Sequence, residues 1–411
     1  MSTPVTVIGT GPRRAGSCSP SRLSCSGGAG SRRRSVIRRS LAGRLRWTPH
    51  MGVSMRIAQL APTFERVPPR TYGGTELIVG LVTDELVRRG HDVTLFASGD
   101  SRTAARLRSV TPEPIRYGSR TDDDLTHAEY LQLANAQACF LAAAEGEFDL
   151  IHNHAGVEGM VLAATSRTPV VSTMHNPFTA RIQSIWDAYP WFHHAVSAAS
   201  AATFPTRGAL PPIHHGIDVD AVEPDRRPRD IHDPHGYLLF LGRFSAAKGA
   251  DRAIQAARRS GRRLILAGKI DPHDITHVRS AVEPWIDGDH IRTVGEVGGE
   301  TKRALIAGAD ALLFPIEWDE PFGLVMIEAL AAGTPVIGFR RASVPEVIED
   351  GRTGFVVDDV DEMAAAIGRL ADIDRAACRR AAEKRFSVGR MVDDVEAMFR
   401  SVLDRAAVVA G

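Results

Sequence analysis

Short apolar runs alternate with amphipathic stretches from Met55 to the C-terminal end of the chain. A strand buried on both faces of a parallel sheet reads as a continuous apolar run, whereas a covering helix repeats its apolar positions every three or four residues. The alternation therefore predicts parallel sheets covered by helices. The runs that we interpret as strands are RIAQLAP, DVTLFAS, DLIHNH, PVVSTMH, YLLFLGR, RLILAG, HIRTVG, DALLFP and TPVIGF.

The stretches between these runs are expected to be helices. TELIVGLVTDELVRRG places on one helical face Leu77, Ile78, Leu81, Val82 and Leu86. The tail from Val388 to Val402 repeats its apolar residues at the same spacing, so we expect it to pack on another element. Further helices are predicted at residues 126–145, 248–258, 273–284, 299–307, 323–331 and 343–349.

This pattern predicts an α/β fold with two doubly wound, Rossmann-like domains that face a central cleft, where open α/β sheets bind ligands. A length of 411 residues suits two domains. We assign residues 55–212 to the first domain, 237–385 to the second and the Pro-rich, charged residues 213–236 to the linker. Residues 386–411 are expected to form a C-terminal helix that packs back across the domains.

The first 54 residues have a different composition from the rest of the chain. They hold ten Arg and no Lys, Asp or Glu, and they show no periodic apolar positions, which predicts disorder. The opening VTVIGTGPRRAG contains a glycine-rich loop but lacks the strand-turn-helix context of a dinucleotide site. A transit peptide remains an alternative. We prefer the interpretation that Met55 is the natural start and that a translated upstream region precedes it.

Composition narrows the class of protein. Without the leader the chain carries 40 Lys and Arg against 49 Asp and Glu, a net charge of −9, which gives no support to nucleic-acid binding. No apolar run reaches the length that spans a bilayer. The body holds only two cysteines, Cys139 and Cys378, far apart and without metal-ligand spacing, so we expect a reduced, cytoplasmic protein.

Two candidate motifs follow strands of the first domain. In TYGGTE, Gly73 and Gly74 let the backbone approach a ligand at the start of a helix, although paired glycines also occur in ordinary turns. In STMHNPF, His175 follows a strand directly. A structural role for this histidine and a zinc site shared with His152 and His154 are the alternatives.

Two further motifs lie in the second domain. LGRFSAAKG places Arg243 and Lys248 in one loop, where they suit a diphosphate or form an ordinary solvated basic loop. EPFGLVMIE places Glu320 before a helix and Glu328 within it, on either side of apolar residues. The helix N-terminus favours an anion, Glu328 suits the vicinal diol of a ribose, and Glu320 suits a second set of hydroxyls.

Taken together, these motifs, with EPFGLVMIEALAAGTPVIG followed by VPEVIEDGRTGFVV, resemble the retaining GT-B glycosyltransferases of family 4, the glycosyl transferases of group 1. The resemblance covers nearly all of residues 55–405. It implies that the second domain holds a nucleotide-diphosphate sugar and that the first domain holds the acceptor. LAGKID and GFRRAS depart from the family pattern, which puts the identity of the nucleobase and the sugar in doubt.

The resemblance also implies residue roles. Glu328 would bind the ribose, Arg243 and Lys248 the diphosphate and Glu320 the donor sugar, while His175 would lie beside the reacting carbon. The residues expected to act in catalysis are His175, Glu320, Arg243 and Lys248. Those expected to bind the donor are Gly73, Gly74, Arg243, Lys248, Glu320, Phe322, Gly323, Leu324 and Glu328.

The implied activity is that of a retaining, metal-independent hexosyltransferase that moves a sugar from a UDP- or GDP-sugar to an acceptor hydroxyl, with no cofactor besides this donor and no bound metal. A catalytically silent nucleotide-sugar-binding protein and a GT-B phosphorylase-like enzyme are the alternatives, although no motif for a pyridoxal phosphate lysine is present.

The acceptor and the oligomeric state stay open. The acceptor is a small molecule, a glycan or a lipid-linked molecule, and peripheral contact with a membrane is an alternative within this picture. We expect RYGSRTDDDLTHAEY and ARIQSIWDAYPWFHH to shape the acceptor site. In the second stretch, Trp186, Tyr189 and Trp191 either stack on a sugar, touch a lipid surface or belong to the core.

Overall fold

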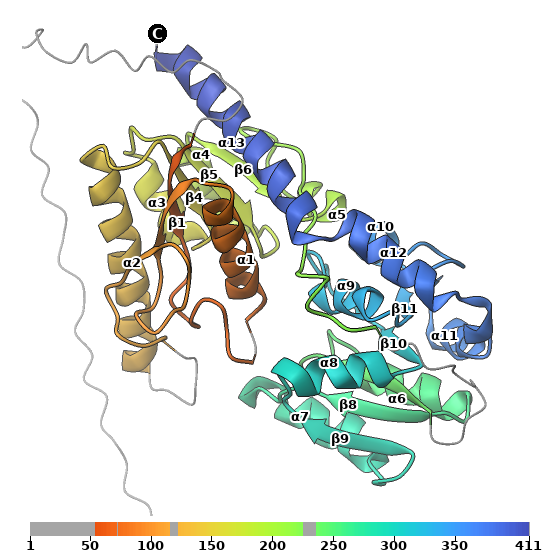
Figure 1. The fold of residues 1–411 in the computed structure, drawn as a ribbon. Coiled ribbons are helices and arrows are strands. Elements are labelled where there is room, and N and C mark those ends of the chain that lie inside the picture. Colours follow the sequence, from red (N-terminus) through yellow and green to blue (C-terminus); the bar gives the residue numbers. More distant parts are fainter. Residues whose placement is uncertain (1–53, 72, 116–121, 225–235, 411) are drawn as a thin grey trace, which may run out of the picture. The chain divides into compact units, whose positions relative to one another are not determined.

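The computed structural model describes residues 54–71, 73–115, 122–224 and 236–410. Its first sheet has six parallel strands in the order β3-β2-β1-β4-β5-β6, of which β1, β4, β5 and β6 are labelled in Figure 1. They are β1 (Arg56–Leu60), β2 (Asp92–Phe96), β3 (Arg106–Arg108), β4 (Leu150–Asn153), β5 (Val170–Met174) and β6 (Phe192–Ala195).

The second sheet also has six parallel strands, in the order β12-β11-β10-β7-β8-β9. Counted from β7, this repeats the order of the first sheet, so the predicted α/β fold with two doubly wound sheets is confirmed. Its strands are β7 (Tyr237–Leu241), β8 (Arg263–Ala267), β9 (Ile291–Gly295), β10 (Ala311–Phe314), β11 (Val336–Phe339) and β12 (Gly354–Val357).

In both sheets the strand order reverses at one place, between β1 and β4 and between β7 and β10. Loops that leave the carboxyl ends of these two neighbouring strands turn to opposite faces of the sheet, which opens a crevice between them. The loops after β4, β7 and β10 carry His154, Lys248 and Glu320 respectively. The topology thus places three polar side chains where such sheets bind ligands.

The helices of the first half are α1 (Gly74–Arg88), α2 (Asp122–Ala144), α3 (Val157–Ala163), α4 (Gln183–Ala188) and α5 (Ala198–Ala201). Those of the second half are α6 (Ala250–Arg259), α7 (Ile275–His277), α8 (Gly299–Gly308), α9 (Leu324–Ala331), α10 (Val344–Val347), α11 (Val360–Ile367), α12 (Arg375–Arg385) and α13 (Val388–Ala410).

The helix expected at residues 273–284 is not continuous in the structure. A 3-10 turn at Pro272–Asp274, the short α7, a π turn at Val278–Val282 and a second 3-10 turn at Glu283–Trp285 follow one another. Pro284 has no N–H to donate and so cannot continue a helical ladder. The prediction of one regular helix over residues 273–284 is therefore wrong.

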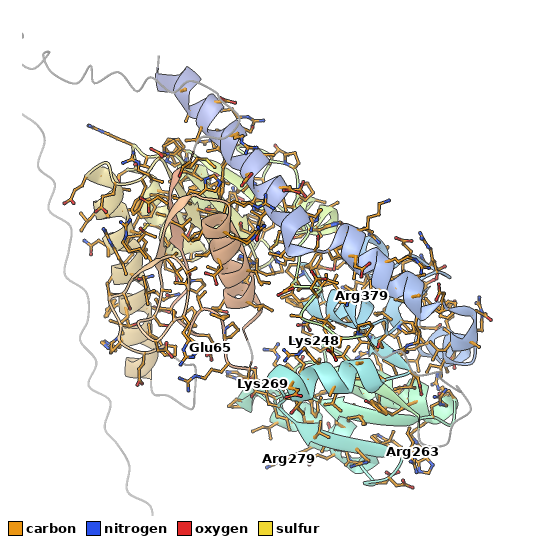
Figure 2. All side chains as sticks on the ribbon, in the orientation of Figure 1. Glu65, Lys248, Arg263, Lys269, Arg279 and Arg379 are labelled. Atoms are coloured by element: carbon orange, nitrogen blue, oxygen red, sulfur yellow. The ribbon has the colours of Figure 1, made fainter. Side chains whose placement is uncertain are left out.

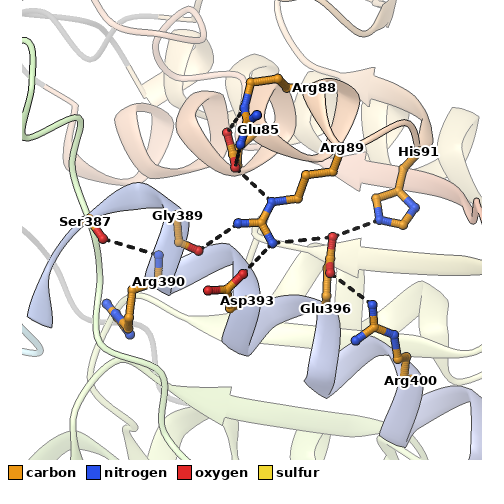
Figure 3. Close-up of polar contacts among 10 residues, drawn as sticks. All are labelled: Glu85, Arg88, Arg89, His91, Ser387, Gly389, Arg390, Asp393, Glu396 and Arg400. Carbon is orange, nitrogen blue, oxygen red and sulfur yellow. Dashed lines mark hydrogen bonds and ion pairs between the residues drawn. The ribbon is translucent and has the colours of Figure 1, made fainter. Parts of the chain in front are cut away.

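The long C-terminal helix α13 packs against α1. Met391, Val395 and Phe399 of α13 are buried in one apolar cluster with Ile78 and Val82 of α1. Arg89, directly after α1, donates hydrogen bonds to Asp393 and to the carbonyl oxygen of Gly389 on α13, and we call this polar contact the Arg89 seam (Figure 3). The C-terminal end of the chain therefore helps to cover the first sheet.

Trp186 and Tyr189 lie in the core under the first sheet, with exposed fractions of 5% and 3%. Trp191 packs against the same cluster, and its Nε1 donates a hydrogen bond to the carbonyl oxygen of Ala163 at 3.0 Å. Of the interpretations open at the sequence level, the structure favours the core for all three.

The leader before residue 54 and the segment 116–121, which begins the expected acceptor loop, lie outside the described residues. Within the described ranges, none of the helices combines the length and the apolar character needed to cross a bilayer.

Candidate active site

Two loops of the second sheet, one after β7 and one after β10, lie directly against each other at Gly249. This glycine has a φ of 80°, and a Cβ at its position would lie 2.2 Å from the carbonyl oxygen of Pro315. Only glycine combines this backbone conformation with such a close approach. The contact brings the loop that ends in Lys248 beside the loop that carries Glu320.

Lys248, Trp318 and Glu320 form a small polar cluster at this place; Lys248 is labelled in Figure 2. The Lys248 ammonium forms an ion pair with Oε2 of Glu320, and Nε1 of Trp318 donates to the same oxygen at 2.8 Å. The ammonium also lies 4.8 Å from the centroid of the Trp318 ring. Within the described part of the chain nothing donates a hydrogen bond to Oε1 of Glu320. One oxygen of this carboxylate is therefore fixed and the other is available.

The helix α9 begins directly after Gly323, which has a φ of 82°. A Cβ there would lie 2.8 Å from Cε of Met326 and 3.0 Å from the ring of Phe314, so a larger residue would displace the turn. The first N–H groups of a helix have no partner within it, and here they follow Phe322 and Gly323. A Cβ on Gly74, the first residue of α1, would lie 3.3 Å from Cδ1 of Leu324. The glycine loop before α1 and the start of α9, both predicted as ligand-binding backbone, are adjacent.

Glu328 lies inside α9 and has one satisfied and one unsatisfied oxygen. Its Oε1 accepts a hydrogen bond from Nζ of Lys302 on α8 at 2.7 Å. Its Oε2 is buried and has no hydrogen-bond partner among the described residues. A buried carboxylate oxygen without a partner is unfavourable unless a ligand or water supplies a donor. Oε2 of Glu328 is thus placed to accept a hydrogen bond from a hydroxyl group of a ligand.

Arg243, by contrast, does not share partners with Lys248. Its Nη1 pairs with Asp271 at 3.1 Å, and its Nε lies 3.4 Å from Asp274 without hydrogen-bond geometry. Lys269 pairs with Asp271 from the other side at 3.1 Å. Burial acts to raise the pKa of Asp271, but the hydrogen bonds from Lys269 and Arg243 outweigh it and lower that pKa. The two cations predicted from one loop therefore have different carboxylate partners.

His175 follows β5 and contacts other histidines on two sides. Its Nε2 lies 2.9 Å from Nδ1 of His154, and its ring stacks on His215 with centroids 5.4 Å apart. His215 in turn meets the ring of Phe322 edge to face, with centroids 5.1 Å apart. Burial, followed by the neighbouring His194, lowers the pKa of His175 to about 3, so this imidazole is neutral at physiological pH.

The alternative of a zinc site at His152, His154 and His175 is not supported by the arrangement of these side chains. The three rings hydrogen bond to one another and to Gln59 and Thr173. Across the described ranges no group of three or more His, Cys, Asp or Glu side chains is placed to hold a metal ion. The histidines instead form a network that ends at His175.

Three residues at this site were not recognised from the sequence. Trp318 lies two residues before Glu320, and its proximity in WDE was the available signal. Lys302 lies on a predicted helix, but the sequence did not show that its side chain reaches Glu328. Glu76, in the first turn of α1, is buried, and burial raises the pKa of its carboxyl to about 7. The contact of Lys302 with Glu328 and the burial of Glu76 could not be derived from spacing, because both arise from the tertiary fold.

Two family models match the chain. The model for glycosyl transferases group 1 matches residues 235–372, and the model for Glycosyltransferase Family 4 matches residues 72–211. Together they include all of the predicted site residues, from Gly73 to Glu328.

Individual proteins agree with these models. Phosphatidyl-myo-inositol mannosyltransferase from Mycolicibacterium smegmatis is 26% identical over 348 residues, which cover 77% of this chain and 85% of the relative. Sucrose-phosphate synthase from Thermosynechococcus elongatus shares the fold with a TM-score of 0.68 at 20% identity, over 85% of this chain and 100% of the other. The structure of Anabaena HepE in complex with UDP and glucose matches with a TM-score of 0.65 at 20% identity, over 84% and 100% of the two chains.

Proposed function

The chain belongs to the group 1 and family 4 glycosyltransferases and has their GT-B fold, and from this premise we propose that it transfers a hexose from a UDP- or GDP-sugar to an acceptor hydroxyl with retention of anomeric configuration. The observation that carries the proposal is the pair of carboxylates Glu320 and Glu328. Each has one oxygen fixed by a lysine and the other without a hydrogen-bond partner among the described residues, on either side of the start of α9.

The donor is expected to lie across the start of α9. The unsatisfied Oε2 of Glu328 suits a ribose hydroxyl, because a buried carboxylate oxygen gains a charge-assisted hydrogen bond from such a donor. Oε1 of Glu320 suits a hydroxyl of the transferred sugar. The diphosphate between them would meet the first N–H groups of α9, where the helix dipole favours an anion. Gly73 and Gly74 lie beside this helix start, and without a Cβ they would let the diphosphate approach the backbone closely.

Lys248 and Arg243 supply the positive charge for the departing diphosphate. An ammonium has three donors, so the ion pair with Glu320 leaves two for phosphate oxygens. The Arg243 side chain is 41% exposed, and its guanidinium keeps further N–H groups beyond those directed at Asp271 and Asp274. These cations and the helix N-terminus would offset the charge that develops on the leaving group, so we propose that the reaction requires neither a metal ion nor a cofactor.

The reaction breaks the bond between the anomeric carbon and the phosphate oxygen, and that electron pair stays on the diphosphate. The acceptor oxygen forms the new bond on the same face of the sugar, and its proton passes to the leaving phosphate oxygen. No covalent bond to the protein is needed in this route. His175, which is neutral, would orient the donor sugar beside the reacting carbon.

The relatives support the substrate class. HepE is described with UDP and glucose, and the mycobacterial relative is a mannosyltransferase, so both act on or bind sugars of the class proposed here. The buried free thiols Cys139 and Cys378 support a reducing compartment such as the cytoplasm, because thiols remain reduced there. The acceptor is a small molecule, a glycan or a lipid-linked molecule.

Calorimetric titration with UDP- and GDP-sugars tests the donor site. Replacing Glu328 with Gln should weaken donor affinity by about 1.5–3 kcal/mol. The carboxylate has two acceptor oxygens, whereas the amide has only one and carries no charge. Glu383→Gln is the matched control, since Glu383 lies on α12 with a half-exposed side chain that pairs with Arg379, and this variant should bind as the wild type does. Equal affinity of Glu328→Gln and the wild type would refute the ribose assignment.

A turnover measurement separates the proposed transferase from the silent binding protein. Incubating each nucleotide sugar with the wild type and following release of the nucleoside diphosphate should reveal slow hydrolysis of the correct donor even without an acceptor. Tight binding without any release of diphosphate, in the presence of a panel of acceptors, would favour the silent alternative.

A further inference from the structure

A continuous chain of hydrogen bonds runs across the face of the first sheet that α13 covers and ends at His175. Its members are buried side chains at or near the carboxyl ends of β4, β5 and β6, and they lie one to the next within hydrogen-bond distance. The links are Ala195 to His194 at 3.1 Å, His194 to Thr173 at 2.7 Å, Thr173 to His152 at 2.7 Å, His152 to His154 at 3.2 Å and His154 to His175 at 2.9 Å.

The backbone carbonyl of Ala195 sets the direction of this chain. A carbonyl oxygen only accepts, so Nδ1 of His194 carries the hydrogen that faces it. A neutral imidazole has a single N–H, and Nε2 of His194 is therefore an acceptor. The hydroxyl of Thr173 donates to it, which leaves the Thr173 oxygen to accept from Nε2 of His152.

The same argument carries the direction to His175. With its hydrogen on Nε2, His152 has an acceptor at Nδ1, which takes the N–H of Nε2 of His154. His154 then has an acceptor at Nδ1, and only an N–H on Nε2 of His175 can complete the last link. At each step one donor meets one acceptor, so the chain has a single consistent orientation from Ala195 to His175.

Gln59 anchors the chain a second time. Its Oε1 lies 3.1 Å from Nε2 of His154, and an amide oxygen only accepts. This contact requires the hydrogen of His154 on Nε2, which is the position that the first anchor assigns. The His154 N–H is shared between Gln59 and His152 in a three-centre bond. Two acceptors on different strands thus agree on the tautomer of His154.

We propose that His154 is a positioning residue that holds His175 as the Nε2–H tautomer and so presents Nδ1 of His175 as a hydrogen-bond acceptor. No described residue hydrogen bonds to this Nδ1, and His175 is half-buried, whereas the other histidines of the network, His152, His154 and His194, are buried. The tautomer of a histidine is set by the bond that its other nitrogen makes, which is the role of His154 here. A consequence for the reaction, which rests on the proposed function, is that His175 would accept a hydroxyl hydrogen of the donor sugar.

Burial keeps every ring of the chain neutral, which the single orientation requires. It lowers the pKa of His152 and His154 well below the ordinary value and that of His194 to about 4. A protonated ring would have two donors and would break the sequence of donor and acceptor. At physiological pH the network therefore keeps one tautomer.

Nitrogen-15 NMR of the full chain with labelled histidine tests this proposal without any substrate. The two nitrogens of a neutral imidazole give separate pyrrole-type and pyridine-type signals, and the His175→Gln spectrum assigns the pair that belongs to His175. We expect Nε2 of His175 to be of the pyrrole type and Nδ1 of the pyridine type. The opposite assignment, or an averaged pair, would overturn the proposal.

Three variants extend the test. His154→Phe keeps the ring volume but removes the acceptor, so the His175 signals should shift towards an averaged pair. His154→Asn keeps an oxygen near the position of Nδ1 and should restore the wild-type pair. His193→Phe is the control, because His193 is a buried histidine on β6 that packs on Trp186 and is not a member of the chain. Unchanged His175 signals in a folded His154→Phe would contradict the proposal, and if this variant does not fold, the wild-type spectrum alone decides.

Activity gives a separate readout. If His175 acts as proposed, His154→Phe should lower kcat by about tenfold or more with a smaller change in the KM of the donor, and His154→Asn should recover most of the loss. An unchanged kcat in His154→Phe would refute the positioning role. A wild type that transfers no sugar would refute the proposed function, whereas the NMR result on the tautomer would still stand.

Discussion

Glu76 is a buried carboxyl at the N-terminus of α1, next to the glycine pair. Only 6% of the residue is exposed, and Oε2 would lie 3.0 Å from a Cβ on Gly73. Burial raises its pKa to about 7, against the opposing effect of a backbone hydrogen bond. Around neutral pH the start of α1 therefore carries either a neutral or an ionised carboxyl, and the ionised form would oppose an anionic ligand there.

The raised pKa predicts a pH-dependent stability. Glu76 keeps its proton in the folded state to a higher pH than in the unfolded chain, so its contribution is intact below about pH 4.5 and is lost as the pH rises through 7. Glu76→Gln cannot ionise. Thermal denaturation should show this variant gaining up to about 3 kcal/mol on the wild type between pH 4.5 and pH 8.

Glu383→Gln, at a half-exposed position on α12, serves as the control and should show no such gain. A difference between Glu76→Gln and the wild type that stays constant across this pH range would show that the carboxyl does not titrate there.

At the scale of elements, α13 is held on α1 by an apolar face and by the seam around Arg89 (Figure 3). The guanidinium of Arg89 donates to Glu85 at 2.8 Å, to Asp393 at 2.7 Å and to the carbonyl oxygen of Gly389 at 2.9 Å. Glu396 lies 3.6 Å from it and receives His91 at 3.1 Å. One arginine thus joins the end of α1 to two turns of α13.

Replacing Arg89 should weaken the packing of α13 against α1. Arg89→Ala is expected to destabilise the protein by about 2 kcal/mol, because it removes a mostly buried guanidinium that donates to Glu85, Asp393 and the carbonyl oxygen of Gly389 at once. Arg400→Ala is the matched control: Arg400 also pairs with Glu396, at 3.0 Å, but its side chain is 52% exposed, so the loss should stay below about 1 kcal/mol. Chemical denaturation of both variants makes the comparison, and equal losses would show that the seam contributes little.

The apolar pattern predicted the long buried strands and most of the helices, because burial on both faces leaves a strong signal in the sequence. It did not predict β3, β6 and β12. Two of the three residues of β3 (RLR) are charged, and FHHA of β6 contains two histidines, whereas GFVV of β12 is apolar and as long as the predicted β10 and β11. The short helices α3, α4 and α5 were also missed, since few turns give little periodicity. The helices α11 and α12 were missed as well, although they are as long as the predicted α9 and α6.

The candidate site shows the same limit. Sequence motifs indicated Lys248, Glu320, Glu328 and His175 as candidates by residue type and by position after strands. The partners of these residues came only from the fold, because Lys248 meets Glu320 across 72 positions of the chain. The pairing of Arg243 with Asp271 rather than with a shared partner of Lys248 also depends on how the loops after β7 and β8 meet.

At the scale of the whole molecule, the chain combines two sheets of the same strand order with a leader of opposite charge character. Because the leader holds ten arginines, the net charge of the whole chain is +1, although the rest of the chain has a net charge of −9. The family models begin after this segment, at residues 72 and 235. The backbone N–H of Met55 donates to Nδ1 of His91 at 3.1 Å, and Met55 is buried, so the folded body includes this residue.

A variant that begins at Met55 tests whether the leader matters for the body. Deleting residues 1–54 should leave the denaturation midpoint and the kcat for donor hydrolysis unchanged, because the segment has no core-forming pattern. A truncated protein that fails to fold, or that loses activity while folded, would show that the leader contributes to the structure or to the site.

The central claim is that cations of the second sheet stabilise a departing nucleotide diphosphate, and the kinetics of Lys248→Ala and Arg243→Ala test it most directly. Charge on the diphosphate grows as the glycosidic bond breaks, so each cation should matter more in the transition state than in the bound donor. We expect each variant to lower kcat on the order of a hundredfold or more with a smaller rise in the KM of the donor. Arg259→Ala, which removes an exposed cation of α6 that pairs with Asp361, should change kcat little, and so should a chelator. Retained kcat in both Lys248→Ala and Arg243→Ala, together with activity that vanishes with chelator and returns with a divalent ion, would contradict the account.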